Sequence, residues 1–190
     1  MTGGRRRFAL LLVLAALGGC ATSPPAPLQR APEASDAAFT LAGRLSARHG
    51  TDAVAGGFTW THAPPRDRIE LSTPLGQTLA QLDGEPGNVS VQLADGRVER
   101  AATWSELTKR ALGVTIPVEG LAFWIRGRAA PGSRGTVERD SAGRVSALHQ
   151  NGWDVTYAYA DDASTLPQRV TLTYPGAEPI EVRVVVDAMQ

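Results

Sequence analysis

Apolar and polar residues alternate along most of the chain from residue 39 onward, which is the spacing of half-buried β-strands. The first such segment places five apolar or small residues on one face, namely Phe39, Leu41, Gly43, Leu45 and Ala47. Similar alternation predicts strands at residues 54–61, 69–72, 78–82, 89–93, 145–150, 153–159, 170–174 and 180–186. Asp95-Gly96, which leads to a further strand from Val98, and Asn151-Gly152 are strong signals for tight hairpins. The pattern therefore predicts antiparallel strands joined by short turns.

The middle of the chain has helical spacing instead. Thr103 and Glu106 fit a capping box, in which Thr103 caps the first turn and Glu106 reaches back to its N–H. Trp104, Leu107, Ala111 and Leu112 then follow at helical intervals, and Gly113 suits the end of the helix. A second short helix is expected over residues 118–126, with an apolar face of Leu121, Trp124 and Ile125.

The order of these elements indicates the fold class. Strands come first, two short helices follow, and strands resume to the end of the chain. The prediction is a mostly β protein, an open antiparallel β-barrel or curved sheet with helices packed into or over its concave side. Residues 39–190 form one domain in this interpretation.

The N-terminal segment has the composition of a targeting signal. Arg5, Arg6 and Arg7 precede an apolar run of about ten residues, too short for a transmembrane helix. Gly18 and Gly19 then precede Cys20, the only cysteine. This arrangement resembles the bacterial lipobox and predicts a signal peptide at residues 1–19 and a lipidated Cys20. The alternative is a plain secretory signal with an incidental cysteine.

The segment at residues 20–38 is rich in proline, alanine and serine, so we expect a flexible tether between lipid and domain. Ala21 stands where aspartate commonly favours retention in the inner membrane of such lipoproteins. The alanine at position 21 therefore points to the outer membrane.

Charge and motifs restrict the function. Removing residues 1–19 removes three of nineteen basic residues and none of nineteen acidic ones, which leaves a formal net charge of −3. That balance offers no basic surface for nucleic acid. His49, His62 and His149 are scattered and are expected at the surface. No catalytic residues, metal ligands or cofactor-binding motif are predicted.

Several short motifs resemble the LolB family of outer-membrane lipoprotein receptors. The order and spacing of these motifs carry the resemblance, which covers residues 39–186. The motifs are Ala42-Gly43-Arg44-Leu45, Phe58-Thr59-Trp60, Pro74-Leu75-Gly76, Pro86-Gly87-Asn88-Val89, Ile116-Pro117-Val118, Phe123-Trp124-Ile125-Arg126-Gly127 and Gln150-Asn151-Gly152-Trp153. The resemblance implies an open barrel with an apolar cavity for the acyl chains of lipoprotein cargo. It also implies the periplasmic carrier LolA as partner and a monomer that faces the periplasm from the inner leaflet. The chain departs from the family pattern in two features at the rim of the barrel. The tether leaves little room for the N-terminal amphipathic helix that the family usually has, and the chain lacks a terminal aromatic segment.

Large apolar residues on the predicted strands and helices are candidates for the wall of that cavity. They are Phe58, Trp60, Trp104, Leu107, Leu121, Trp124, Ile125, Trp153 and Tyr157. The alternative is that each of them simply fills a core.

Leu75 stands between Pro74 and Gly76 in a predicted turn, where a polar residue is the usual choice. An apolar tip there suggests a loop that dips into lipid, and the resemblance implies the same role. The alternative is a leucine folded back onto the sheet.

The leading hypothesis is a non-enzymatic receptor that accepts lipoproteins from LolA and inserts them into the outer membrane without nucleotide. The alternatives are a lipoprotein that carries free phospholipid or glycolipid, an envelope hydrolase, and a structural lipoprotein with a filled core.

Overall fold

A computed structural model describes residues 29–30 and 36–190 of the chain. Before the helices it contains seven strands: β1 (Gln29–Arg30), β2 (Phe39–His49), β3 (Asp52–Ala63), β4 (Arg66–Ser72), β5 (Thr78–Glu85), β6 (Asn88–Leu93) and β7 (Val98–Ala101). Two helices follow, α1 (Trp104–Leu112) and α2 (Val118–Trp124). The chain ends with β8 (Thr136–Arg139), β9 (Val145–Gln150), β10 (Trp153–Ala158), β11 (Arg169–Tyr174) and β12 (Ile180–Met189).

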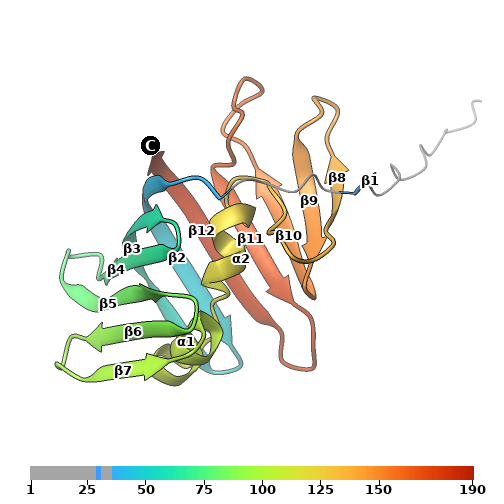
Figure 1. The fold of residues 1–190 in the computed structure, drawn as a ribbon. Helices are drawn as coiled ribbons and strands as arrows, with labels where there is room; N and C mark the ends of the chain where they lie inside the picture. The colour runs from blue at the N-terminus through green and yellow to red at the C-terminus, as the bar shows by residue number, and fades with distance from the viewer. Residues whose placement is uncertain (1–28, 31–35) are drawn as a thin grey trace, which may run out of the picture.

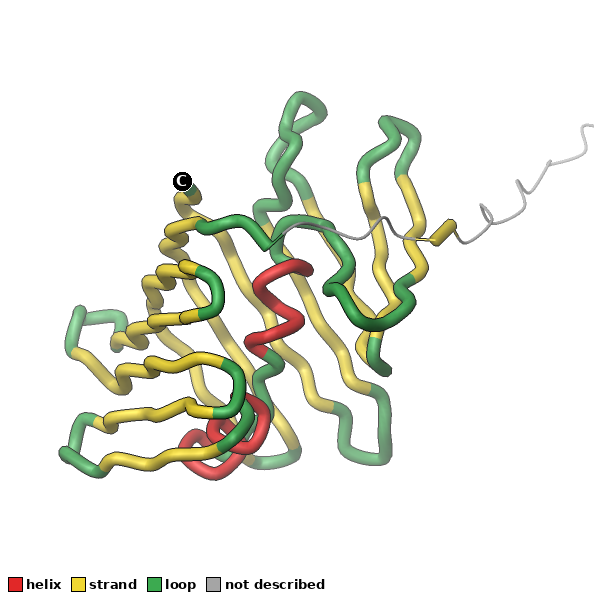
Figure 2. Tube along the Cα trace, in the orientation of Figure 1, coloured by secondary structure: helices red, strands yellow, loops and turns green. Residues whose placement is uncertain are grey.

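All these strands form one antiparallel sheet in the order β1-β8-β9-β10-β11-β12-β2-β3-β4-β5-β6-β7. The two edge strands among the described residues, β1 and β7, do not pair with each other, so the barrel stays open. The sheet curls strongly, and both helices lie in the hollow on one side of it (Figures 1 and 2). The predicted fold class, an open antiparallel barrel with helices on its concave side, is confirmed.

Period-two alternation is the physical basis of this sheet. Buried and exposed residues alternate along β2, and the five predicted inward residues from Phe39 to Ala47 are all buried. The turn between β9 and β10 has positive φ at both Asn151 (55°) and Gly152 (79°), as a tight hairpin of the predicted kind requires.

The antiparallel order divides the strand connections between two rims. We call one the Leu75 rim; it carries the connections at residues 50–51, 73–77, 94–97, 151–152 and 175–179. We call the other the Phe39 rim; it carries the start of β2, the connections at 64–65, 86–87, 140–144 and 159–168, and the end of β12. Chain entry from the tether and the Leu75 turn are therefore on opposite rims.

The helices differ from prediction in detail. The Thr103 hydroxyl accepts a hydrogen bond from the Glu106 amide (3.2 Å), but the Glu106 carboxylate lies 3.5 Å from Arg110 instead of returning to the cap. The second helix ends at Trp124 rather than at residue 126. The reason is a tightened last turn, in which the Gly127 amide donates to the Trp124 carbonyl (2.8 Å) and Gly127 has φ of 68°.

Two short strands were not predicted. β8 pairs with β9, and β1 pairs with β8 at its outer edge, where backbone groups would otherwise lack partners. Residues 29–30 of the expected flexible tether are thus part of the sheet.

Candidate functional site

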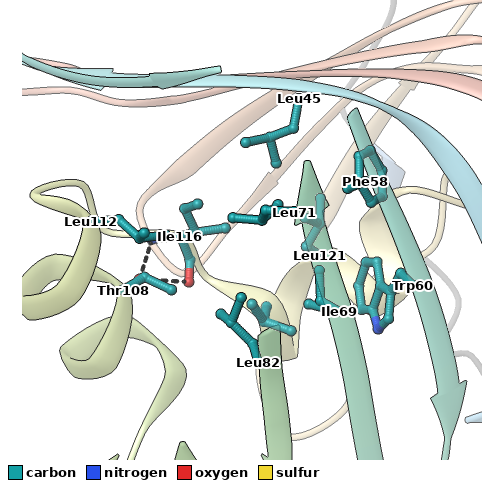
Figure 3. Close-up of a pocket in the computed structure, with 11 residues that line it drawn as sticks. Leu45, Phe58, Trp60, Ile69, Leu71, Leu82, Thr108, Leu112, Ile116 and Leu121 are labelled. Atoms are coloured by element: carbon teal, nitrogen blue, oxygen red, sulfur yellow. Dashed lines mark hydrogen bonds between the residues drawn. The ribbon is translucent and has the colours of Figure 1, made fainter. Parts of the chain in front are cut away.

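A small apolar void lies between the sheet and the connection of the two helices (Figure 3). Its volume is about 20 Å³, room for about one water molecule. Ten of its lining residues are apolar and one is a threonine: Leu45, Phe58, Trp60, Ile69, Leu71, Leu82, Thr108, Leu112, Ile116, Val118 and Leu121. In this structure the interior is therefore close to filled.

Thr108, on α1, holds the connection that covers this void. Its buried hydroxyl accepts a hydrogen bond from the Ile116 amide (2.8 Å) and donates to the Trp104 carbonyl (2.9 Å), and the contact with Ile116 is visible in Figure 3. At the end of the same helix, the Lys109 ammonium donates to the Gly113 carbonyl (2.7 Å). Side chains of α1 thus secure the segment that leads to α2.

A second part of the interior is filled by α2. The Trp124 indole N–H donates to Gln150 Oε1 (2.7 Å), which also accepts from the Ala130 amide (2.8 Å). Trp153 packs against Trp124 with ring centroids 6.3 Å apart. Gly120 permits this packing, since a Cβ atom there would lie 2.5 Å from the Trp124 ring. The network ties α2 to β9 and β10.

The nine predicted cavity residues all belong to, or pack against, one hydrophobic core. Phe58, Trp60 and Leu121 line the void, and the others, Trp104, Leu107, Trp124, Ile125, Trp153 and Tyr157, lie elsewhere in that core. The prediction did not include the aliphatic residues that complete the lining, because they come from segments that meet only in the folded chain. Contact with acyl chains stays a prediction for all nine.

Three buried donors have no hydrogen-bond acceptor among the described residues: the Trp104 indole N–H, the Tyr157 hydroxyl and Arg126 Nη2. Burial raises the pKa of Tyr157 well above its usual range, and Tyr159 adds to the effect. Tyr157 is therefore a neutral side chain in an apolar setting.

The Pro74-Leu75-Gly76 turn connects β4 and β5 and is closed by three hydrogen bonds. The Gly76 amide donates to the Thr73 carbonyl (2.9 Å), the Thr73 amide to the Gln77 carbonyl (2.8 Å), and the Gln77 amide to the Thr73 hydroxyl (3.1 Å). Gly76 has φ of 83°, a conformation that favours glycine. Leu75 is 90% exposed, so it projects into solvent and is not folded back onto the sheet.

Each of the three histidines lies against a charged side chain. His49 contacts Lys109, and His149 contacts Asp154 and Glu138. No serine or threonine hydroxyl among residues 36–190 is hydrogen-bonded to a histidine. The expectation of three surface histidines is wrong for His62, which is 4% exposed; Phe58, Trp60 and His62 share the inward face of β3.

No three histidine, cysteine, aspartate or glutamate side chains of the described residues lie close enough to hold a metal ion. Within the same residues, no helix is both long and apolar enough to cross a membrane. Cys20 and the signal peptide lie outside the described residues.

Comparison with solved structures supports the class that this geometry defines, an incomplete β-barrel with helices in its hollow. A LolA superfamily protein from Nitrosomonas europaea superimposes with a TM-score of 0.51 at 7% identity, over 83% of this chain and 87% of that one. A DUF1329 family protein from Desulfovibrio piger gives a TM-score of 0.50 at 8% identity, over 80% and 85%. At these identities the likeness concerns the fold alone.

Sequence comparison is more specific. The family model described as outer membrane lipoprotein LolB matches residues 37–188. Proteins named outer-membrane lipoprotein LolB are 37% identical in Thiobacillus denitrificans (97% of this chain, 98% of that protein) and 36% identical in Chromobacterium violaceum (97% and 99%). The chain belongs to the LolB family of outer-membrane lipoproteins, so the predicted family and the predicted location at the outer membrane are confirmed.

Proposed function

We propose that this protein is the lipid-anchored receptor that accepts lipoproteins from a LolA-type periplasmic carrier and inserts them into the outer membrane without nucleotide. Membership of the LolB family is the observation that carries the proposal. The proposal includes a signal peptide at residues 1–19, a lipidated Cys20, a tether at 20–38 and an acyl-binding domain at 39–190. The protein acts as a monomer and needs no cofactor.

The cargo's acyl chains enter by displacing the helices from the hollow of the sheet. The void of about 20 Å³ lies where α1, its connection to α2 and the sheet pack together without filling the space between them. Since the sheet is open between β7 and β1, the wall can widen without breaking a strand pair. The nine predicted residues, from Phe58 on β3 to Tyr157 on β10, are the proposed contacts.

The cost of exposing acyl chains to water explains why an interior binding site is needed. Each methylene that leaves water contributes about 0.8 kcal/mol, so three acyl chains represent tens of kcal/mol. Exchanging a few hydrogen bonds such as Thr108–Ile116 for hydrogen bonds to water costs about 0.5–1.5 kcal/mol each. Direction without nucleotide then follows from differences in affinity, with cargo bound more tightly here than on the carrier.

The Leu75 turn is the proposed point of membrane insertion. Its backbone is fixed by its own hydrogen bonds and its apolar side chain is presented to the surroundings, so contact with lipid needs no rearrangement of the loop. Burying one leucine side chain in lipid contributes about 1.5–3 kcal/mol.

Replacing Leu75 by glutamate tests the role of the turn. We expect Leu75→Glu to fold and to take cargo from loaded carrier at the wild-type rate, but to release it into liposomes at least tenfold more slowly. Leu166→Glu is the matched control, because Leu166 is also exposed (47%) but lies on the Phe39 rim.

The two steps are measured separately, with fluorescently labelled lipoprotein on the carrier and with liposomes added afterwards. Equal release by both variants would contradict the insertion role. Loss of uptake in a folded Leu75→Glu protein would instead place Leu75 at the contact with the carrier.

A further inference from the structure

His62 is held between two carboxylates at the Phe39 rim. Its Nδ1 lies 2.7 Å from Asp67 Oδ1 on β4, and its Nε2 lies 2.7 Å from Asp36 Oδ1, in the segment that precedes β2. The Trp60 indole N–H donates to the same Asp67 oxygen (2.7 Å), and the Phe39 ring stacks on the imidazole at 5.0 Å. Three elements therefore meet at one buried side chain.

This geometry selects the charged form of the histidine. A neutral imidazole has one N–H, whereas the imidazolium has two and satisfies both carboxylates. Burial by itself lowers the pKa of His62, but hydrogen bonds and charge from Asp67 and Asp36 outweigh it and raise the pKa above its ordinary value. The charged groups around His62 are thus Asp36, Asp67 and, beyond Phe39, Arg126.

Arg126 connects the same segment to the helices. Its Nη1 donates to the Ala37 carbonyl (3.2 Å), its Nε donates to the Ala122 carbonyl of α2 (3.1 Å), and its guanidinium lies 5.1 Å from the centre of the Phe39 ring. Two residues directly before β2 therefore make polar contacts with the domain, Asp36 with His62 on β3 and Ala37 with Arg126 just after α2. Farther along the tether, Gln29–Arg30 pair with β8.

α2 is also part of the proposed site. Leu121 lines the void, and Trp124 fills the adjacent interior. A force on residues 36–37 is thereby transmitted to the helix that has to move when the interior expands. The exposed Leu75 turn is on the opposite rim, so the tether does not join the domain beside its insertion loop.

We infer that the His62–Asp36–Asp67 cluster attaches the part of the N-terminal tether directly before β2, in addition to the β1–β8 pair, and that Arg126 couples this attachment to α2. The cluster keeps residues 36–38 on the Phe39 rim and α2 in the hollow at the same time. Release of Asp36 frees residues 36–38 from the Phe39 rim and loosens the carboxyl end of α2. The attachment is a property of the folded chain, whereas its use during cargo transfer rests on the function proposed above.

Hydrogen exchange of the full mature chain tests this inference without cargo or carrier. Asp36→Ala removes one partner of His62, and Asp187→Ala is the matched control, because Asp187 forms an exposed ion pair with Arg44 (3.0 Å) and has a similarly exposed side chain (50% against 40%). We expect exchange in residues 36–41 to accelerate about tenfold in Asp36→Ala, as loss of a charge-assisted bond implies, and to stay unchanged in the control.

The amides of Ile125 and Gly127 report on the coupling, since they bond to carbonyls within α2. We expect them to exchange several-fold faster in Asp36→Ala as well. Unchanged exchange at both places would overturn the inference. Acceleration at residues 36–41 alone would overturn the coupling through Arg126, and neither result depends on what the interior binds.

Discussion

Removal of the Thr108 hydroxyl is the sharpest perturbation of the closed interior. Thr108→Val keeps the size and branching of the side chain but leaves the buried Ile116 amide without the acceptor that now lies 2.8 Å away. An unsatisfied buried N–H costs about 1–3 kcal/mol. For a domain of this size, each kcal/mol lowers the melting temperature by about 2–4 °C, so the expected decrease is about 2–12 °C.

The same substitution favours the expanded interior. The Ile116 amide regains a partner, water, when the connection moves away from the sheet, so the penalty applies mainly to the closed form. Since 1.4 kcal/mol corresponds to a factor of ten, a penalty of about 1–3 kcal/mol raises the opened population about 5- to 150-fold. A fluorescent apolar probe should accordingly bind more tightly to Thr108→Val than to the wild type.

The assay is denaturant unfolding followed by probe titration, with Thr61→Val as control. Thr61 is exposed on β3, and its substitution should change the free energy of unfolding by no more than about 0.5 kcal/mol. The role of Thr108 in closing the interior is contradicted if both variants unfold at the same denaturant concentration. It is also contradicted if a destabilised Thr108→Val binds the probe no better than the wild type.

Three further predictions concern packing and charge in the same domain. Gly120→Ala should destabilise by about 1–3 kcal/mol although alanine favours helices, because its Cβ would meet the Trp124 ring at 2.5 Å; equal or higher stability in thermal unfolding would show that the ring moves aside easily. Gln150→Leu should cost about 2–5 kcal/mol, since it removes the acceptor of two buried donors, and a loss below 1 kcal/mol would contradict the network. His62 has a raised pKa in the folded state, so its stabilising contribution is complete below about pH 6.5 and is lost as pH rises through the folded pKa. Unfolding free energies measured from pH 6 to pH 9 should show this loss in the wild type and much less of it in Asp36→Ala.

Local patterns were sufficient to predict most of the sheet. Alternation along residues 39–47 and the Asn151-Gly152 turn act within one strand or hairpin, and the structure has both as predicted. β8 was missed because its four residues are too few for a periodic signal, and β1 because its pairing depends on a distant edge.

The site was harder to predict, because it depends on contacts between distant segments. Whether Phe58 lines a void or fills a core is decided by Ile116 and Leu121, more than fifty residues away. The burial of His62 could be predicted from the sequence, because His62 follows Phe58 and Trp60 at the same spacing of two residues. Its partner Asp36 could not, because it lies in a segment without a periodic pattern of apolar residues. The turn at Leu75 allowed an exposed or a folded-back leucine, and the structure has the exposed one that was favoured.

The most direct test of the receptor function is a transfer assay between carrier and protein. LolA-type carrier loaded with a radiolabelled lipoprotein is mixed with residues 21–190, which lack the lipid attachment site, in the absence of nucleotide. If the protein is the receptor, we expect cargo to move to it and to be recovered in complex with it. Cargo that stays on the carrier, while the protein binds free phospholipid, would contradict the account and identify a lipid carrier instead.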